Sequence, residues 1–174
     1  GCASRELDSY FAQARAGMAP GAGALLITHG IAGSGKSHTA AQLAQLGWIH
    51  LRSDAERRRL FGRWGVGSAP SQGAAELGDA YDPAIGERLY RDLLPSAAAA
   101  ALAAGLAVVV DATFLRRSQR LLFRDLAARS GAGFGILACA APMEEIEARI
   151  KRRQAMGLDP SEADAAVAQR QIGE

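Results

Sequence analysis

The chain has 174 residues, of which 49% are hydrophobic and 22% are charged, a balance typical of one globular domain with a sizeable apolar core. The formal net charge of only +2 argues against a general nucleic-acid-binding protein, and the lack of any run of about 18 apolar residues excludes an ordinary membrane-spanning helix. Two cysteines are too few for a disulfide framework, so we expect a cytoplasmic protein without a membrane partner.

The first predicted segment, residues 1–23, combines a short amphipathic helix over 4–17 with a turn-rich connector. Residues 24–174 form the main domain, in which short apolar runs alternate with helical patterns. The predicted strands are residues 24–29, 48–53, 106–110 and 134–140. The predicted helices are residues 37–47, 54–62, 82–104, 116–130, 142–157 and 161–171.

Two segments interrupt this alternation. Residues 62–80 are rich in Gly, Ser and Pro and predict a mobile loop or a variable insertion, and Pro95 predicts a kink or break in the long helix. The alternation as a whole predicts an α/β fold with a parallel sheet covered by helices on both faces. The chain ends where such a fold usually adds a strand, so either a fifth strand lies beyond residue 174 or the sheet is short.

A glycine-rich loop joins the first predicted strand to the helix after it. Gly30, Gly35, Lys36 and Ser37 fit the pattern G-x-x-x-x-G-K followed by S or T. Glycines let the backbone curl so that its N–H groups point at phosphate oxygens, and the next helix presents its positive end to the same anion. The alternative is a glycine-rich turn that binds nothing. We predict nucleotide binding by the loop residues Gly30, Gly33, Ser34, Gly35, Lys36, Ser37 and His38.

A metal site is predicted beside this loop. The apolar run 107–110 ends at Asp111, which places a carboxylate at the carboxyl end of the sheet. A carboxylate there and the Ser37 hydroxyl can both ligate Mg²⁺, whereas Lys36 can reach the β- and γ-phosphates. The alternative for Asp111 is that it only caps the following turn.

Asp54 and Arg57 follow the second predicted strand at the same edge. A carboxylate in this place can accept the proton of a substrate hydroxyl that attacks the γ-phosphate, and Arg57, on the same helical face, can bind an anionic or polar part of the substrate. The alternative is an ordinary helix N-cap followed by a solvated arginine.

Further arginines are candidates at the site. Arg149 and Arg153 lie four residues apart on one helical face, from which they can close over the phosphates and neutralise charge in the transition state. Arg116 begins another helix and is a candidate for substrate binding. The alternative for each is a solvated basic face. Three histidines, at positions 29, 38 and 50, lack metal-ligand spacing, so we expect core or surface roles for them.

Four segments, THGIAGSGKS, LRSDAERRRLFG, VVVDATFLRRSQR and DPSEADAAVAQRQ, together resemble the AAA-type P-loop kinase domain found in bacteria behind an aminoglycoside-phosphotransferase-like domain. More broadly, the chain is similar to the polynucleotide-kinase and zeta-toxin group of small P-loop kinases, over about residues 24–171. The resemblance implies a three-layer sandwich with strand order 2-3-1-4-5, ATP and Mg²⁺ as ligands, and a fused N-terminal partner domain. It also implies the roles given above for Lys36, Ser37, Asp54, Arg57, Asp111, Arg149 and Arg153.

We therefore expect an ATP-dependent kinase that acts on a hydroxyl of a small molecule or of a nucleic-acid end, with Lys36, Asp54, Arg149 and Arg153 as the catalytic residues. The alternative is a non-catalytic or slowly hydrolysing ATP-binding module that regulates a fused partner. The chain contains no N-K-x-D segment, which disfavours a guanine-specific switch.

Overall fold

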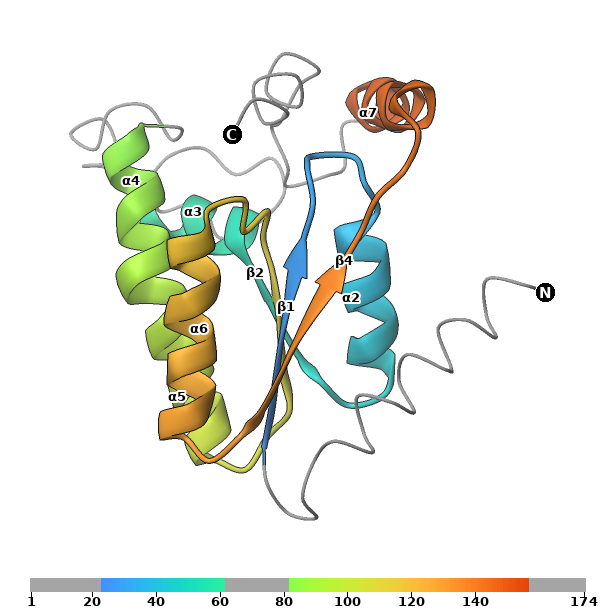
Figure 1. Cartoon of the computed structure of the whole chain (residues 1–174). Coiled ribbons are helices and arrows are strands. Elements are labelled where there is room, and N and C mark those ends of the chain that lie inside the picture. Colours follow the sequence, from blue (N-terminus) through green and yellow to red (C-terminus); the bar gives the residue numbers. More distant parts are fainter. Residues whose placement is uncertain (1–22, 62–81, 157–174) are drawn as a thin grey trace.

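The computed structural model describes residues 23–61 and 82–156. The predicted N-terminal helix, the loop at 62–80 and the final helix at 161–171 lie outside these residues. The described residues form a parallel sheet of four strands in the order β2-β3-β1-β4, with helices on both faces (Figure 1). This arrangement confirms the predicted fold class and the predicted order of the first four strands.

The two central strands are buried on both faces, as their apolar sequences predict. β1 (Ala24–His29) pairs with β3 (Val108–Asp111) on one side and with β4 (Gly133–Ala138) on the other, and β2 (Ile49–Arg52) pairs with the far side of β3. β4 is an outer strand of this sheet, and Ile136 within it is 45% exposed. The third strand begins two residues later than predicted and includes Asp111.

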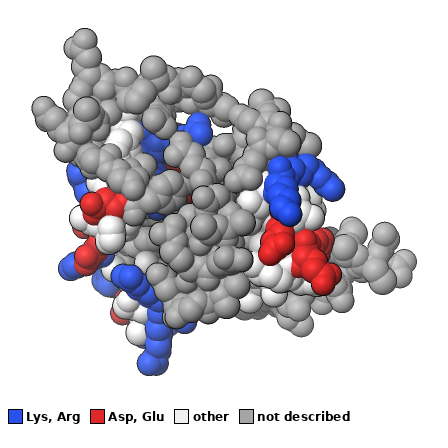
Figure 2. Space-filling model, turned by 90° about the horizontal axis from the view of Figure 1, so that it is seen from above, with Lys and Arg blue, Asp and Glu red and all other residues white. Residues whose placement is uncertain are grey.

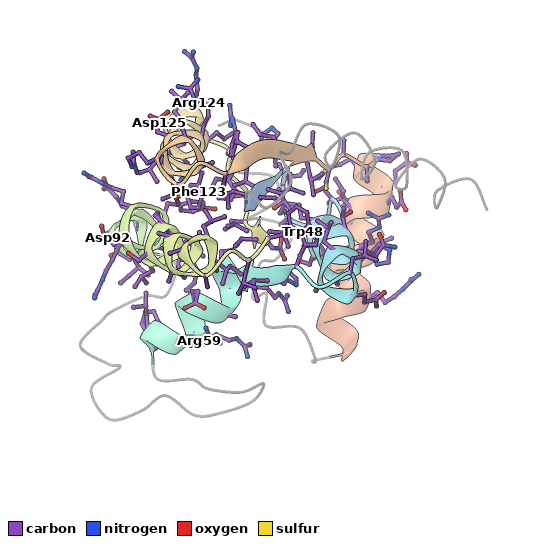
Figure 3. All side chains as sticks on the ribbon, turned by 90° about the horizontal axis from the view of Figure 1, so that it is seen from below. Trp48, Arg59, Asp92, Phe123, Arg124 and Asp125 are labelled. Atoms are coloured by element: carbon purple, nitrogen blue, oxygen red, sulfur yellow. The ribbon has the colours of Figure 1, made fainter. Side chains whose placement is uncertain are left out.

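The helices are α2 (Lys36–Gln45), α3 (Ser53–Leu60), α4 (Pro83–Arg88), α5 (Leu94–Ala103), α6 (Arg117–Arg129) and α7 (Met143–Met156). α2 covers one face of the sheet and α5 and α6 cover the other (Figure 1). On α6, Phe123 points into the core, whereas Arg124 and Asp125 lie on the outer side (Figure 3). One sheet with helices on both faces gives the three layers that the resemblance implies.

The predicted long helix over 82–104 is divided into three parts. Between α4 and α5, residues Leu89–Leu93 form a π-helical turn, labelled η2, and Pro95 lies in the first turn of α5. Proline lacks the N–H for a regular helical hydrogen bond, and its ring crowds the carbonyl four residues before it. A wider turn just before Pro95 relieves this crowding, so the predicted kink takes the form of a π turn.

The last described helix, α7, lies at the carboxyl end of the sheet, beside the loop between β1 and α2 (Figure 1). Ile146 and Ile150 of α7 are 2% and 1% exposed and pack against Ala32 of that loop. The helix is thus fixed to the glycine-rich loop by apolar contacts. None of the described helices is long and apolar enough to cross a membrane.

Candidate active site

The glycine-rich loop adopts the curled backbone that its sequence predicts. Gly30, Gly33 and Gly35 have φ angles of 143°, 82° and 102°, in the region that favours glycine. A Cβ atom on Gly30 would lie 2.3 Å from the carbonyl oxygen of Cys139, so no larger residue fits. The Gly30 N–H also donates to the Thr113 carbonyl oxygen at 3.1 Å, which ties the loop to the turn after β3.

Two polar side chains are buried inside this loop. Lys36 is 9% exposed, and its Nζ donates to the Ile31 carbonyl oxygen at 2.8 Å. Ser34 is 5% exposed, and its Oγ has no hydrogen-bond partner in the described part of the chain. A buried hydroxyl without a partner is unfavourable, and a phosphate oxygen in the loop would supply one. The loop therefore fits an anionic ligand, as predicted.

Asp111 lies at the end of β3, 5% exposed, and is surrounded by groups from β2 and α2. His50 Nε2 is 3.2 Å and Arg52 Nε 3.8 Å from Asp111 Oδ2, and the Ser37 hydroxyl lies close enough to influence the same carboxyl group. Burial raises the pKa of Asp111, but hydrogen bonding with His50 and Ser37 and the electrostatic influence of His50 and Lys36 lower it by more, so that the pKa lies below its ordinary value. The carboxylate is therefore ionised at neutral pH.

The contact between His50 and Asp111 was missed by the sequence prediction, which gave His50 a core or surface role. In the parallel register of β2 and β3, His50 lies opposite Val109 and Arg52 opposite Asp111. Residues two apart on a strand point to the same face, so His50, Arg52 and Asp111 share one face of the sheet. Strand order and register together would have revealed this contact, whereas the spacing of histidines along the sequence contains no such signal.

The residues predicted for Mg²⁺ come together. The Ser37 hydroxyl and the ionised Asp111 carboxylate are hard oxygen donors of the kind that Mg²⁺ prefers. Within residues 23–61 and 82–156, no group of three or more His, Cys, Asp or Glu side chains is arranged to hold a metal. Water and phosphate oxygens would therefore have to complete the six ligands, which is the usual arrangement for Mg²⁺ at a nucleotide.

Asp54 and Arg57 lie on α3, directly after β2, at the carboxyl end of the sheet (Figure 1). Both side chains are half-buried. The charge of Arg57 acts on the hydroxyl of Tyr90, a residue of η2 that shares a hydrogen bond of 3.0 Å with the Thr113 hydroxyl. Burial of Tyr90 outweighs this charge and its hydrogen bonds, and raises the pKa of the phenol above its ordinary value.

Of the predicted arginines, Arg149 contacts the loop directly. One of its nitrogens donates to the Gly33 carbonyl oxygen at 3.3 Å, and another to Glu145 Oε1 at 2.6 Å. Arg153 follows one turn later on α7, on the same face of the helix backbone. Helical spacing and the packing of α7 on the loop thus bring at least one of the predicted pair to the site.

Two other candidates lie at the surface of the structure. Arg116 is exposed at the start of α6, where its backbone N–H donates to Gln119 Oε1 at 3.3 Å. The exposed His38 side chain is 3.4 Å from Gln42 Nε2 on the outer side of α2. Seen from above, the described residues at this end expose acidic as well as basic side chains (Figure 2). The described side chains that are visible from this side are therefore of mixed charge.

Arg120, on α6, has a structural role. It donates to the carbonyl oxygens of Phe114 and Leu115, each at 2.6 Å. Phe114 has a φ of 46°, which is uncommon for a bulky residue. The arginine thus helps to hold the turn after β3, to which the glycine-rich loop is bonded.

Solved structures with the same fold include the following three. A protein from Chloroflexus aurantiacus, described as a candidate kinase, has a TM-score of 0.59 at 20% identity, and the match covers 86% of this chain and 75% of that one. The APS kinase CysC from Mycobacterium tuberculosis, in complex with AMPPNP and APS, has a TM-score of 0.56 at 25% identity, with coverages of 77% and 72%. A gluconokinase from Sinorhizobium meliloti has a TM-score of 0.51 at 20% identity, with coverages of 87% and 74%. These likenesses show that the chain has a P-loop kinase fold.

Comparison at the level of sequence gives the family. No curated protein matches the chain. The profile of the AAA domain family matches residues 25–174, a range that contains the glycine-rich loop, Asp111 and Arg149. Because this match spans most of the sequence, the chain belongs to the AAA domain family, with a P-loop kinase fold.

Proposed function

We propose that this protein is an ATP-dependent phosphotransferase that moves the γ-phosphate of ATP to a hydroxyl group. The observation that carries the proposal is the meeting of Lys36, Ser37 and Asp111 at the carboxyl end of the sheet. A curled loop for phosphates, a buried lysine and an ionised carboxylate beside a serine hydroxyl form the minimal set for holding a nucleotide with its metal ion.

The donor half of the reaction uses the glycine-rich loop. The loop N–H groups and the Ser34 hydroxyl bind phosphate oxygens, and Lys36 exchanges the Ile31 carbonyl oxygen for an oxygen of the terminal phosphates. Ser37 and Asp111 hold Mg²⁺, which when bound neutralises part of the phosphate charge. The structurally similar APS kinase, which was solved in complex with AMPPNP, supports an adenine nucleotide as the donor.

The acceptor half uses α3. The Asp54 carboxylate takes the proton of the acceptor hydroxyl as its oxygen bonds to the γ-phosphorus. The bond between that phosphorus and the oxygen bridging to the β-phosphate breaks, and ADP leaves with the electron pair. Arg149 and Arg153 offset the charge on the transferring group, and Arg57 and Arg116 bind the rest of the acceptor.

The test is ATP consumption by the full chain, measured with and without a panel of hydroxyl compounds. The panel begins with gluconate and APS, because the similar solved structures include a gluconokinase and an APS kinase, and adds an oligonucleotide with a 5′-hydroxyl end. We expect one class of acceptor to raise ATP consumption and to become phosphorylated. The variant Asp54→Asn should bind ATP with unchanged affinity and lose transfer by about 10²-fold or more.

Glu56→Gln is the matched control, since Glu56 lies on the same turn of α3 but pairs with Arg59. This variant should transfer phosphate at the normal rate. Normal transfer by Asp54→Asn would disprove the assigned base. Slow ATP hydrolysis that no acceptor accelerates would instead support the non-catalytic module.

A further inference from the structure

We propose that His50 is a positioning residue for the metal site: it holds the Asp111 carboxylate in the orientation that Mg²⁺ requires. This inference rests on the proposed function, because it deepens the account of the same site. It is carried by the contact of 3.2 Å between His50 Nε2 and Asp111 Oδ2. In this arrangement His50 Nε2 is not a metal ligand, since it is already hydrogen-bonded to the Asp111 carboxylate.

The strand pairing makes this contact specific. β2 and β3 run in register, so the backbone fixes His50 diagonally across from Asp111 on the same face of the sheet. The His50 side chain is only 16% exposed and that of Asp111 only 5%, which shields their hydrogen bond from water. The pair is thus built from two adjacent strands rather than from mobile surface side chains.

Both contacts from β2 reach the same carboxylate oxygen. His50 Nε2 is 3.2 Å and Arg52 Nε 3.8 Å from Oδ2. The His50 contact is short enough for a directional hydrogen bond, whereas the Arg52 Nε contact is an ion pair without that directionality, so the orientation of the carboxylate depends chiefly on His50. A carboxylate restrained in this way does not have to lose torsional freedom when the metal ion arrives.

The effect of such restraint on metal affinity is known from other metal sites. Removing a hydrogen-bond partner of a ligand lowers metal affinity by about 10-fold to 100-fold. Of the two partners, His50 is the closer and the less exposed, with Arg52 at 29% exposure. We therefore assign the larger share of the positioning to His50.

The experiment compares His50→Leu and His50→Gln with the unaltered full chain. The probe is a fluorescent ATP analogue, whose affinity is measured in EDTA and then across a Mg²⁺ titration, with Mn²⁺ binding followed separately by electron paramagnetic resonance. For His50→Leu we expect unchanged nucleotide affinity in EDTA, and a rise of about 10-fold to 100-fold in the Mg²⁺ concentration at half-saturation. His50→Gln, whose amide can reach the carboxylate, should restore most of the metal affinity.

His29→Leu is the matched control. His29 is also a half-buried strand histidine, but its Nδ1 lies 3.2 Å from the Phe114 carbonyl oxygen rather than from a carboxylate. His29→Leu should leave the Mg²⁺ concentration at half-saturation unchanged, even if it shifts the midpoint of urea denaturation. Should His50→Leu fail to fold, His50→Asn takes its place, because the asparagine amide is too short to replace Nε2.

Two outcomes would overturn the inference. One is a Mg²⁺ requirement in His50→Leu, or in the His50→Asn that replaces it, within twofold of the unaltered chain. Another is an equal loss of nucleotide affinity with and without metal, which would indicate a purely structural role. Failure of the proposed phosphotransfer gives a different result, in which Mg²⁺ and ATP bind as expected but no acceptor is phosphorylated.

Discussion

Gly30 illustrates how strongly a single residue can be dictated by its surroundings. Its φ of 143° is a conformation for glycine alone, and its missing Cβ would overlap the Cys139 carbonyl oxygen. The backbone of β1 and that of the segment after β4 can approach each other only because no side chain stands between them. The glycine is thus needed for the packing of the chain as well as for a ligand.

We predict that Gly30→Ala lowers the free energy of unfolding by about 3 kcal/mol or more, because it adds backbone strain and overlap with a fixed carbonyl. Gly47→Ala is the matched control, since Gly47 has a φ of 91° but open space around its Cα. Strain alone should cost this control about 1–2 kcal/mol. Urea denaturation measures both values, and equal losses would show that the overlap with Cys139 has no effect.

Tyr90 gives a prediction for alkaline pH. Burial raises the pKa of its phenol above the ordinary value of 10.0, so the folded chain keeps this proton at pH values where the unfolded chain has lost it. The contribution of the protonated Tyr90 hydroxyl to the free energy of unfolding is therefore complete below pH 10, and it is lost as the pH rises through the raised pKa.

Tyr90→Phe should cost about 1 kcal/mol at pH 8, through the lost hydrogen bond to Thr113, and less at pH 11. Urea denaturation of both proteins at the two pH values measures this difference. Phe keeps the edge-to-face contact with Phe114, so the comparison isolates the hydroxyl. A gap that stays constant or widens between pH 8 and pH 11 would contradict the assigned direction of the pKa.

At the scale of elements, the placing of α7 links stability to ligand binding. Ile146 and Ile150 cover Ala32, and a Cβ atom on Gly33 would lie 2.9 Å from the Ile146 side chain. The same helix holds Arg149 against the Gly33 carbonyl oxygen. The shape of the glycine-rich loop therefore depends on a helix more than 100 residues later in the chain.

We predict that Ile150→Ala costs about 2–5 kcal/mol of unfolding free energy and also weakens ATP binding, because the loop loses its apolar support. Leu102→Ala, in the core on the other face of the sheet, should destabilise the chain by a similar amount. Its ATP affinity should stay within twofold of the unaltered chain. Calorimetric titration with ATP measures the affinity of each variant. An equal change of affinity in the two variants would contradict a specific role of α7 in supporting the loop.

The sequence could predict the elements with strong local signals. The glycine-rich loop was predictable because Gly30, Gly33 and Gly35 occur in a fixed pattern between an apolar run and a helical one. The π turn was not, because Pro95 shows that a helix is disturbed but not how its backbone adapts. The contact of His50 with Asp111 was not predicted either, since it depends on which strands are neighbours and in what register.

At the scale of the whole molecule, the sheet separates the polar residues of the candidate site into two groups, one on each of its faces. His50, Arg52 and Asp111 share the sheet face that α2 covers, together with Ser37 and Lys36. Tyr90 comes from the helical layer on the opposite face, and its hydroxyl meets Thr113 at the carboxyl end of the sheet. The predicted order of strands was sufficient to place the loop beside Asp111, but not to assign these residues to the two faces.

The burial of Lys36 has a practical consequence for spectroscopy. The chain contains only one other lysine, Lys151, which is exposed on α7. Reductive methylation with ¹³C-formaldehyde would therefore introduce at most two lysine signals into a carbon NMR spectrum, and the two amines differ sharply in their access to the reagent. Because the Lys36 amine must leave the Ile31 carbonyl oxygen to react, the rate at which the second lysine signal appears would report the opening of that contact, without assignment of the rest of the protein.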